Sequence, residues 1–171
     1  MVLKSKRVLA GTRRASHNVK SALLGRPGFL IRRLHQIHGY LFAQQTVDFG
    51  VTPVQYSVMT VLSERAESDQ ITIAREVGLE RTTVADVLAR LEARGLVTRH
   101  SDPMDQRVRL ARLSAEGQQL VKNMFKAVER AHALTIAPLS KPEQKQLMML
   151  LVRVLEANNE VGNVPFQLSK H

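Results

Sequence analysis

Several hydrogen-bonding side chains between Arg81 and Arg90 surround an apolar stripe at helical spacing. Val84, Leu88 and Leu91 recur with the period of a helix, which predicts one buried face. The remaining faces carry Arg81, Thr82, Thr83, Ala85, Asp86 and Arg90. Side chains of this length and polarity suit the major groove of DNA, where base edges present hydrogen-bond donors and acceptors. We therefore expect these residues to contact bases and phosphates.

Asp86 has two interpretations. A carboxylate in the major groove can accept a hydrogen bond from N4 of cytosine, although phosphates repel it. Alternatively, Asp86 forms an ion pair with Arg90, because residues four positions apart are neighbours on a helix surface. Both interpretations fit the sequence.

A short helix and a tight turn are needed to position this recognition helix. The sequence predicts the short helix at Ile73–Val77, with Thr72 as its N-cap, because a threonine oxygen can accept an otherwise unpaired backbone N–H. Gly78 ends the short helix and the recognition helix begins near Arg81. Gly95 then ends the recognition helix, since glycine readily adopts the left-handed conformation found after many helices.

Two strand patterns follow, at Leu96–Ser101 and Arg107–Leu113, joined by a turn rich in proline and aspartate. Side chains alternate along a strand, so Arg107 and Arg109 should share one face, whereas Leu110 should face the body of the domain. This order of elements predicts a winged helix-turn-helix, in which the hairpin is the wing.

The run from Gly78 to Gly117 resembles the DNA-binding lobe of MarR-type regulators, whose wing reads D-P-x-D-x-R. The matching wing residues are Asp102, Pro103, Asp105 and Arg107. The resemblance extends more loosely over the helices from 28 to 158. Two positions depart from the family pattern: Glu80 replaces a better N-cap, and Gln106 replaces a second arginine.

The resemblance also assigns roles within the wing. It implies a salt bridge between Asp105 and Arg107, and an exposed pair of this kind contributes only about 0–1 kcal/mol. The effect of the pair would be positional, because it holds Arg107 or Gln106 toward a minor groove. The predicted wing contacts to DNA are therefore Asp105, Gln106, Arg107 and Arg109.

The composition favours packed helices around one core. The chain has 171 residues, of which 44% are hydrophobic but only 4% are aromatic, so we expect one domain, mainly α with a small β-wing. The net charge of +10 should attract polyanions. Because the sequence has no cysteine, disulfides and thiol-based sensing are excluded. We expect no membrane span, and a cytoplasmic protein.

The first 26 residues form a basic N-terminal arm that contains no acidic residue. Its charged residues are Lys4, Lys6, Arg7, Arg13, Arg14, Lys20 and Arg26. A block of like charges is commonly a solvated tail. An arm that contacts phosphates, or one that packs on a partner subunit, is the alternative.

The remaining helices divide a MarR-like domain at 27–158 into a DNA-binding lobe and a dimerisation region. Capping boxes predict helix starts at Thr52 and Ser140. The last helix, at 142–157, is apolar over more than one face, which indicates a homodimer interface. By resemblance, helices 28–47 and 142–157 dimerise, helix 114–135 connects them to the lobe at 52–113, and 159–171 is a C-terminal tail. The partner is then a pseudo-palindromic double-stranded operator.

The resemblance further implies a small-molecule effector, either a small aromatic carboxylate or an aryl-coenzyme A thioester. Its binding residues would be Phe29, Arg32, Arg33, His35, His38, Tyr56 and Met59. Arg32 or Arg33 could hold a carboxylate. His35 and His38 lie one helical turn apart, but no carboxylate or thiol at a matching spacing accompanies them, so we favour pocket-edge histidines over a metal site. No cofactor is expected.

Two other functional classes are less consistent with the sequence. An enzyme is improbable because we find no nucleophile with a base, no metal-ligand spacing and no phosphate-binding loop. A chromatin protein without sequence specificity would share the basic charge, but it would not need a patterned recognition helix. Preference for one sequence over random DNA would separate this alternative from a specific regulator.

Overall fold

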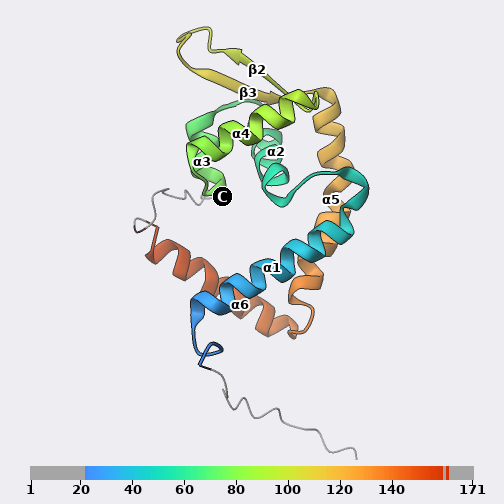
Figure 1. Cartoon of the computed structure of the whole chain (residues 1–171), viewed down its shortest axis with the longest axis vertical. Coiled ribbons are helices and arrows are strands. Elements are labelled where there is room, and N and C mark those ends of the chain that lie inside the picture. Colours follow the sequence, from blue (N-terminus) through green and yellow to red (C-terminus); the bar gives the residue numbers. More distant parts are fainter. Residues whose placement is uncertain (1–21, 160, 162–171) are drawn as a thin grey trace, which may run out of the picture.

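The computed structural model describes residues 22–159 and 161 (Figure 1). Most of the predicted arm and C-terminal tail therefore lies outside the described residues. The elements follow in the order α1 (Pro27–Gln45), the 3-10 helix η1 (Val47–Phe49), α2 (Pro53–Arg65), β1 (Ser68–Asp69), α3 (Gln70–Val77), α4 (Arg81–Ala93), β2 (Val97–Ser101), β3 (Arg109–Leu113), α5 (Ala115–Ile136) and α6 (Lys141–Ala157).

The prediction of a mainly helical fold with a small β-wing is confirmed. Figure 1 shows α2, α3, α4 and the strands gathered at one end, which we call the lobe, and α6 at the opposite end. The long helix α5 runs from the lobe toward α6, and α1 packs against it. No helix in the described part of the chain combines the length and apolar character needed to cross a bilayer.

The core of the lobe is made by one apolar face from each of its elements. Its fully buried side chains come from α2, α3, α4, α5 and the sheet, and are Val58, Met59, Leu62, Ile73, Val84, Leu91, Val97 and Met124. The sheet is antiparallel in the order β1-β3-β2. The two-residue strand β1 pairs with β3 over a long sequence separation and was not predicted.

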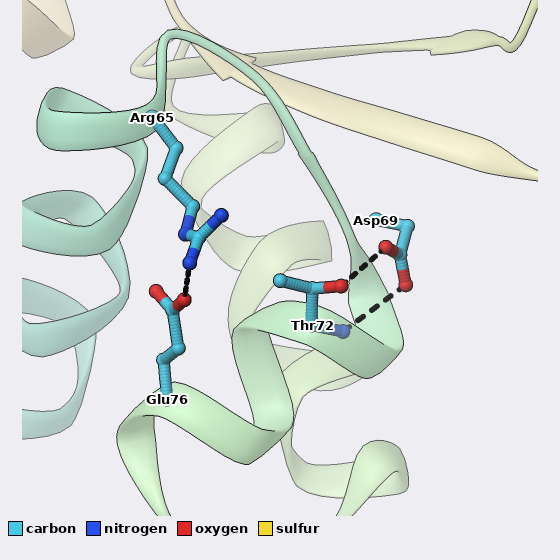
Figure 2. Close-up of polar contacts among 4 residues, drawn as sticks. All are labelled: Arg65, Asp69, Thr72 and Glu76. Atoms are coloured by element: carbon cyan, nitrogen blue, oxygen red, sulfur yellow. Dashed lines mark hydrogen bonds and ion pairs between the residues drawn. The ribbon is translucent and has the colours of Figure 1, made fainter. Parts of the chain in front are cut away.

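The N-cap predicted for α3 is wrong. The helix begins at Gln70 and its N-cap is Asp69, not Thr72. Asp69 Oδ1 accepts hydrogen bonds from the backbone N–H groups of Ile71 and Thr72, at 2.8 and 3.1 Å. The Thr72 hydroxyl instead donates to Asp69 Oδ2 at 2.6 Å (Figure 2). An aspartate satisfies two unpaired backbone donors at once, so it caps the helix one turn earlier than threonine would.

Two other helix ends show how local sequence sets the boundaries. The capping box at Thr52 is confirmed, because its hydroxyl accepts the Gln55 N–H at 3.2 Å while the Gln55 side chain accepts the Thr52 N–H at 3.0 Å. Helix α1 ends at Gln45, two residues before the predicted end. There the Thr46 hydroxyl donates to the Phe42 carbonyl at 2.8 Å, and the chain continues as η1.

The start of α5 is fixed against the end of α4. Ser114 is the N-cap of α5: its Oγ accepts the Gly117 N–H at 3.0 Å and donates to the Gly95 carbonyl at 2.7 Å. Gly117 packs so closely that an added Cβ would collide with the Leu96 carbonyl oxygen. Only glycine allows this approach, which joins the connecting helix rigidly to the lobe.

Helix α6 contrasts with the lobe because none of its residues is buried. Its exposed apolar side chains are Met148, Met149, Leu150, Leu151, Val152, Val154 and Leu155. The alternative that both apolar faces of this helix are covered within one subunit is therefore wrong for the described chain.

Candidate nucleic-acid interface and adjoining pocket

The face of α4 predicted to read DNA is exposed. Val84, Leu88 and Leu91 are buried, as the spacing predicts. Their burial turns the predicted contact residues outward: Arg81, Thr82, Thr83, Asp86 and Arg90 are exposed, and Ala85 is half-buried. The backbone of α4 therefore presents both threonine hydroxyls and the charged groups to solvent.

Asp86 and Arg90 do not form the ion pair that their spacing allows. The ion pairs in the described residues involve other side chains. The Asp86 carboxylate is thus available as an acceptor on the exposed face, which removes the support for the ion-pair interpretation in this structure.

Side chains from outside α4 hold both of its ends. At the start of the helix, Gln70 Nε2 donates to the Arg81 carbonyl at 2.6 Å. At the other end, Arg94 donates to the carbonyls of Gly50 and Phe49 at 2.7 and 3.3 Å. Sequence reasoning missed these contacts, because each joins residues far apart in the chain. They fix how α4 is oriented relative to α3 and to the loop after α1.

The wing differs from its prediction in where its second strand begins. β3 starts at Arg109, so Arg107 lies in the turn and does not share a strand face with Arg109. The predicted salt bridge between the Asp105 and Arg107 side chains is absent among the ion pairs of the described chain. Asp105 Oδ1 instead accepts the backbone N–H of Arg107 at 3.0 Å. Asp105 therefore shapes the turn through the backbone and leaves the Arg107 guanidinium exposed.

The strands of the wing carry further arginines on their exposed surface. Arg109 Nη1 donates to Ser101 Oγ at 3.3 Å across the hairpin, and Arg99 is paired with Glu92 of α4. The buried side chains of β3 are Ala111 and Leu113, whereas Leu110, predicted to face the body, is half-buried. The alternation of β3 is therefore opposite to the predicted one. Gln106 is exposed at the tip of the wing.

A pocket of about 390 Å³ lies between the lobe and the connecting helix. It is lined by residues of α2, α3 and α5, namely Tyr56, Ser57, Thr60, Val61, Glu76, Val77 and His132. Burial raises the pKa of the Tyr56 hydroxyl, so this group is protonated at neutral pH. Of the predicted effector-binding residues, Tyr56 lines this pocket.

A row of rings continues from the pocket into the junction of α1 and α5. His132 stacks on His38, with ring centroids 4.9 Å apart, and Phe42 contacts both His38 and Tyr56. Burial, followed by the nearby His132 and His35, lowers the pKa of His38. His38 is thus a neutral ring at neutral pH. Its Nδ1 lies 2.9 Å from the Thr135 hydroxyl.

The other predicted effector residues lie outside the lining of the pocket. Met59 is fully buried and offers no surface to a ligand in this chain. Phe29, Arg32, Arg33 and His35 belong to the first half of α1, where the Arg32 guanidinium lies 5.3 Å from the Phe29 ring centre. Their contact with an effector stays a prediction.

Sequence reasoning missed two pocket residues with chemistry, Glu76 and His132. On α5, His132 lies four positions after the buried Val128, and this helical spacing could have predicted that His132 faces the same side of the helix. Within the residues that the structure describes, no cluster of three or more histidine, aspartate or glutamate side chains could hold a metal ion.

Comparison with known proteins is consistent with this geometry. The MarR family model matches residues 51–108, from the start of α2 to the wing. The transcriptional repressor NicR of Pseudomonas putida is 26% identical over 79% of this chain and 85% of its own length. The transcriptional regulator HosA of Escherichia coli O111:H- is 30% identical over 74% of this chain and 93% of its own.

Two solved structures share the fold. BpsR of Bordetella bronchiseptica, whose DNA binding is regulated by 6-hydroxynicotinic acid, is 29% identical, with a TM-score of 0.72 over 75% of this chain and 92% of its own. CouR of Rhodococcus jostii RHA1 bound to p-coumaroyl-CoA is 28% identical, with a TM-score of 0.68 over 78% and 94%. Together with the exposed recognition helix and the wing, these similarities show that the chain belongs to the MarR family of transcriptional regulators.

Proposed function

We propose that the protein is a ligand-responsive repressor that binds a pseudo-palindromic operator as a homodimer. The arrangement of α4 carries this proposal. Its apolar stripe is buried in the lobe, so Thr82, Thr83 and Asp86 are exposed, and α4 itself packs against strand β2 of the wing. Such side chains can distinguish base pairs in a major groove.

The two parts of the interface have different roles in this proposal. The α4 residues carry sequence information, whereas Arg107 and Arg109 of the wing bind phosphates or enter a minor groove. Phosphate contacts position the protein and make its affinity depend on salt. The basic arm at 1–26 would add to this electrostatic attraction.

Homodimer formation is supported by the exposed apolar surface of α1 and α6. The Met149 and Leu155 side chains of α6 are 58% and 54% exposed, and α1 exposes Leu30, Ile31 and Ile37 as well. Exposed apolar side chains in this number are costly in water, and a second copy of the chain would cover them. Two lobes would then reach half-sites about 34 Å apart, one turn of the duplex.

The effector is proposed to be a small aromatic acid or its coenzyme A thioester, bound in the pocket between α2, α3 and α5. The pocket has an aromatic wall and several hydroxyl groups, which suits a flat ring with polar substituents. The ligands named for BpsR and CouR are an aromatic acid and an aryl thioester, and both carry a ring hydroxyl. Release from DNA requires the effector to bind one arrangement of the lobes more tightly than the other.

Selection of bound fragments from the source genome tests the DNA-binding part. The dimer should enrich an inverted repeat and prefer it to random DNA by a factor on the order of 10³ at physiological salt. Thr83→Ala should alter the preferred bases, whereas Thr98→Ala, on the exposed base of the wing, should not. Equal affinity for random DNA would instead identify an architectural protein without sequence specificity.

Titration of aromatic acids and thioesters into the operator complex tests the effector part. Fluorescence anisotropy of a labelled operator should fall as an active compound is added. The compound class that dissociates the operator complex at the lower concentration, acids or thioesters, identifies the chemistry of the effector. If no compound in either class lowers the anisotropy, the effector assignment is wrong.

A further inference from the structure

The pocket beside α3 has an unusual electrostatic character for a site expected to bind an aromatic acid. Its lining holds one carboxylate, from Glu76, but neither lysine nor arginine. The arginines expected to hold a ligand carboxylate, Arg32 and Arg33, lie on α1 outside this lining. The end of a ligand that reaches α3 therefore meets a hydrogen-bond acceptor with a negative charge.

Glu76 is paired with a neighbour that does not line the pocket. Arg65, at the end of α2, forms an ion pair with Glu76 Oε1 (Figure 2). The Glu76 side chain is only 12% exposed, whereas that of Arg65 is 48% exposed. Arg65 engages one carboxylate oxygen, so Oε2 can still accept a hydrogen bond from a ligand.

These observations exclude two kinds of ligand group at this end of the pocket. A ligand carboxylate would find no lysine or arginine in the lining, and burying it without a cationic partner is costly. A ligand cation would gain little, because Arg65 already balances Glu76 and the chain has a net charge of +10. An uncharged donor avoids both costs, and its hydrogen bond to a carboxylate is charge-assisted.

We propose that Glu76 selects effectors that present an uncharged hydrogen-bond donor, such as a phenolic hydroxyl, toward α3. Any carboxylate or thioester on the effector then points away from Glu76. This inference rests on the proposed function, since it assigns the orientation of an effector in that same pocket. It makes Glu76 a specificity-determining residue.

Isothermal titration calorimetry on the full-length protein tests the inference with three probes of similar size: 4-hydroxybenzoate, 4-methoxybenzoate and benzylamine. The hydroxyl and methoxy probes share a carboxylate, so their ratio isolates the donor. A hydrogen bond to a charged group implies a preference of about tenfold or more for 4-hydroxybenzoate. Benzylamine, the cation, should bind more weakly than 4-hydroxybenzoate.

Glu76→Gln should reduce this preference to less than about threefold, because the amide accepts only an uncharged hydrogen bond. Glu64→Gln is the matched control: it removes the same charge from an exposed position of α2 outside the pocket. The control should keep the full preference. If Glu76→Gln does not fold, Glu76→Asp is the second variant. It keeps the carboxylate but shortens the side chain by one methylene, so it should also lower the preference for 4-hydroxybenzoate over 4-methoxybenzoate.

The outcomes separate this inference from the function on which it rests. Equal binding of the hydroxyl and methoxy probes, tighter binding of benzylamine, or an unchanged ratio in both Glu76 variants overturns the donor assignment and leaves an effector pocket in place. Absence of binding by all probes, in a protein that still prefers its operator, overturns the aromatic-acid assignment and the donor assignment together.

Discussion

Helices α4 and α6 are both amphipathic, yet they differ in how much of their apolar surface one chain can cover. Val84, Leu88 and Leu91 of α4 are almost completely buried in the lobe. In α6, no residue is buried, and Met149 and Leu155 are more than half exposed. The lobe therefore has a complete core within one chain, whereas the described chain leaves the apolar surface of α6 uncovered.

This difference indicates how the two regions should respond to substitution. Changes in the lobe act on the stability of one chain or on contacts with DNA. In the proposed homodimer, changes on α6 should act on association, and through it on the simultaneous use of two lobes.

The largest expected effect comes from a charge on α6. Leu155→Glu places a carboxylate on the exposed apolar face, and we expect a monomer that loses about 100-fold or more in operator affinity, because avidity is lost. Sedimentation velocity and fluorescence anisotropy measure the two quantities. Arg153→Gln, at an exposed polar position of the same helix, should leave both unchanged. A monomeric Leu155→Glu protein with full affinity would refute the need for two lobes.

A smaller effect is expected at the junction of α4 and α5. Gly117→Ala forces a methyl group against the Leu96 carbonyl, so the free energy of unfolding should fall by about 1–3 kcal/mol. Urea denaturation measures it. Gly39→Ala is the control, because nothing in the described part of the chain lies within 4 Å of its added Cβ. Destabilisation by the control alone would show that α1, not the lobe, is tightly packed.

The cap of α3 gives a pH-dependent prediction. Burial alone would raise the pKa of Asp69, but hydrogen bonds from Thr72 and Ile71 outweigh it and lower the pKa below its ordinary value of 3.8. The ionised cap therefore stabilises the fold above about pH 4, and this contribution is lost as the pH falls through the lowered pKa. Asp69→Asn keeps a capping oxygen but cannot titrate.

We expect Asp69→Asn to cost up to about 1 kcal/mol of unfolding free energy at pH 7. The difference from the wild type should become smaller as the pH falls below about 4, as measured by urea denaturation at pH 7 and near pH 3. A constant difference across this range would mean that the Asp69 charge does not contribute.

The smallest expected effect is in the wing. Arg107→Ala should weaken operator binding by a few-fold and lower the slope of log affinity against log salt by about 1, with the melting temperature unchanged. Arg112→Ala provides the control, since Arg112 lies at the base of the wing and donates to Thr98. Unchanged binding in Arg107→Ala would remove the wing from the interface.

Periodicity and capping predicted most of the lobe. The stripe of α4 has one buried residue for each helical turn. Thr52 and Gln55 form a capping box. Both patterns involve residues only three or four positions apart, so the sequence alone shows them. The cap of α3 was misassigned because Asp69 and Thr72 are both good capping residues and only their geometry separates them. Two predictions for β3 were wrong: the strand starts at Arg109 instead of Arg107, and its buried side chains are Ala111 and Leu113.

The pocket and the supports of α4 could not be predicted in the same way. Glu76 and His132 lie on different helices, and they share a site only because α3 and α5 pack beside α2. The bond from Arg94 to Gly50 spans 44 positions. Contacts of this kind depend on tertiary packing, and a single sequence contains no short-range pattern that predicts them.

The bonds from Arg94 to the carbonyls of Phe49 and Gly50 have a mechanical consequence. They tie the far end of the recognition helix to the loop that leaves α1, while Gln70 holds its near end. A rotation of the helix about its own axis would break these bonds unless that loop moved with it. A small tilt of α1 would thus be transmitted through this loop to α4, and it would rotate the face of α4 that is turned toward the DNA.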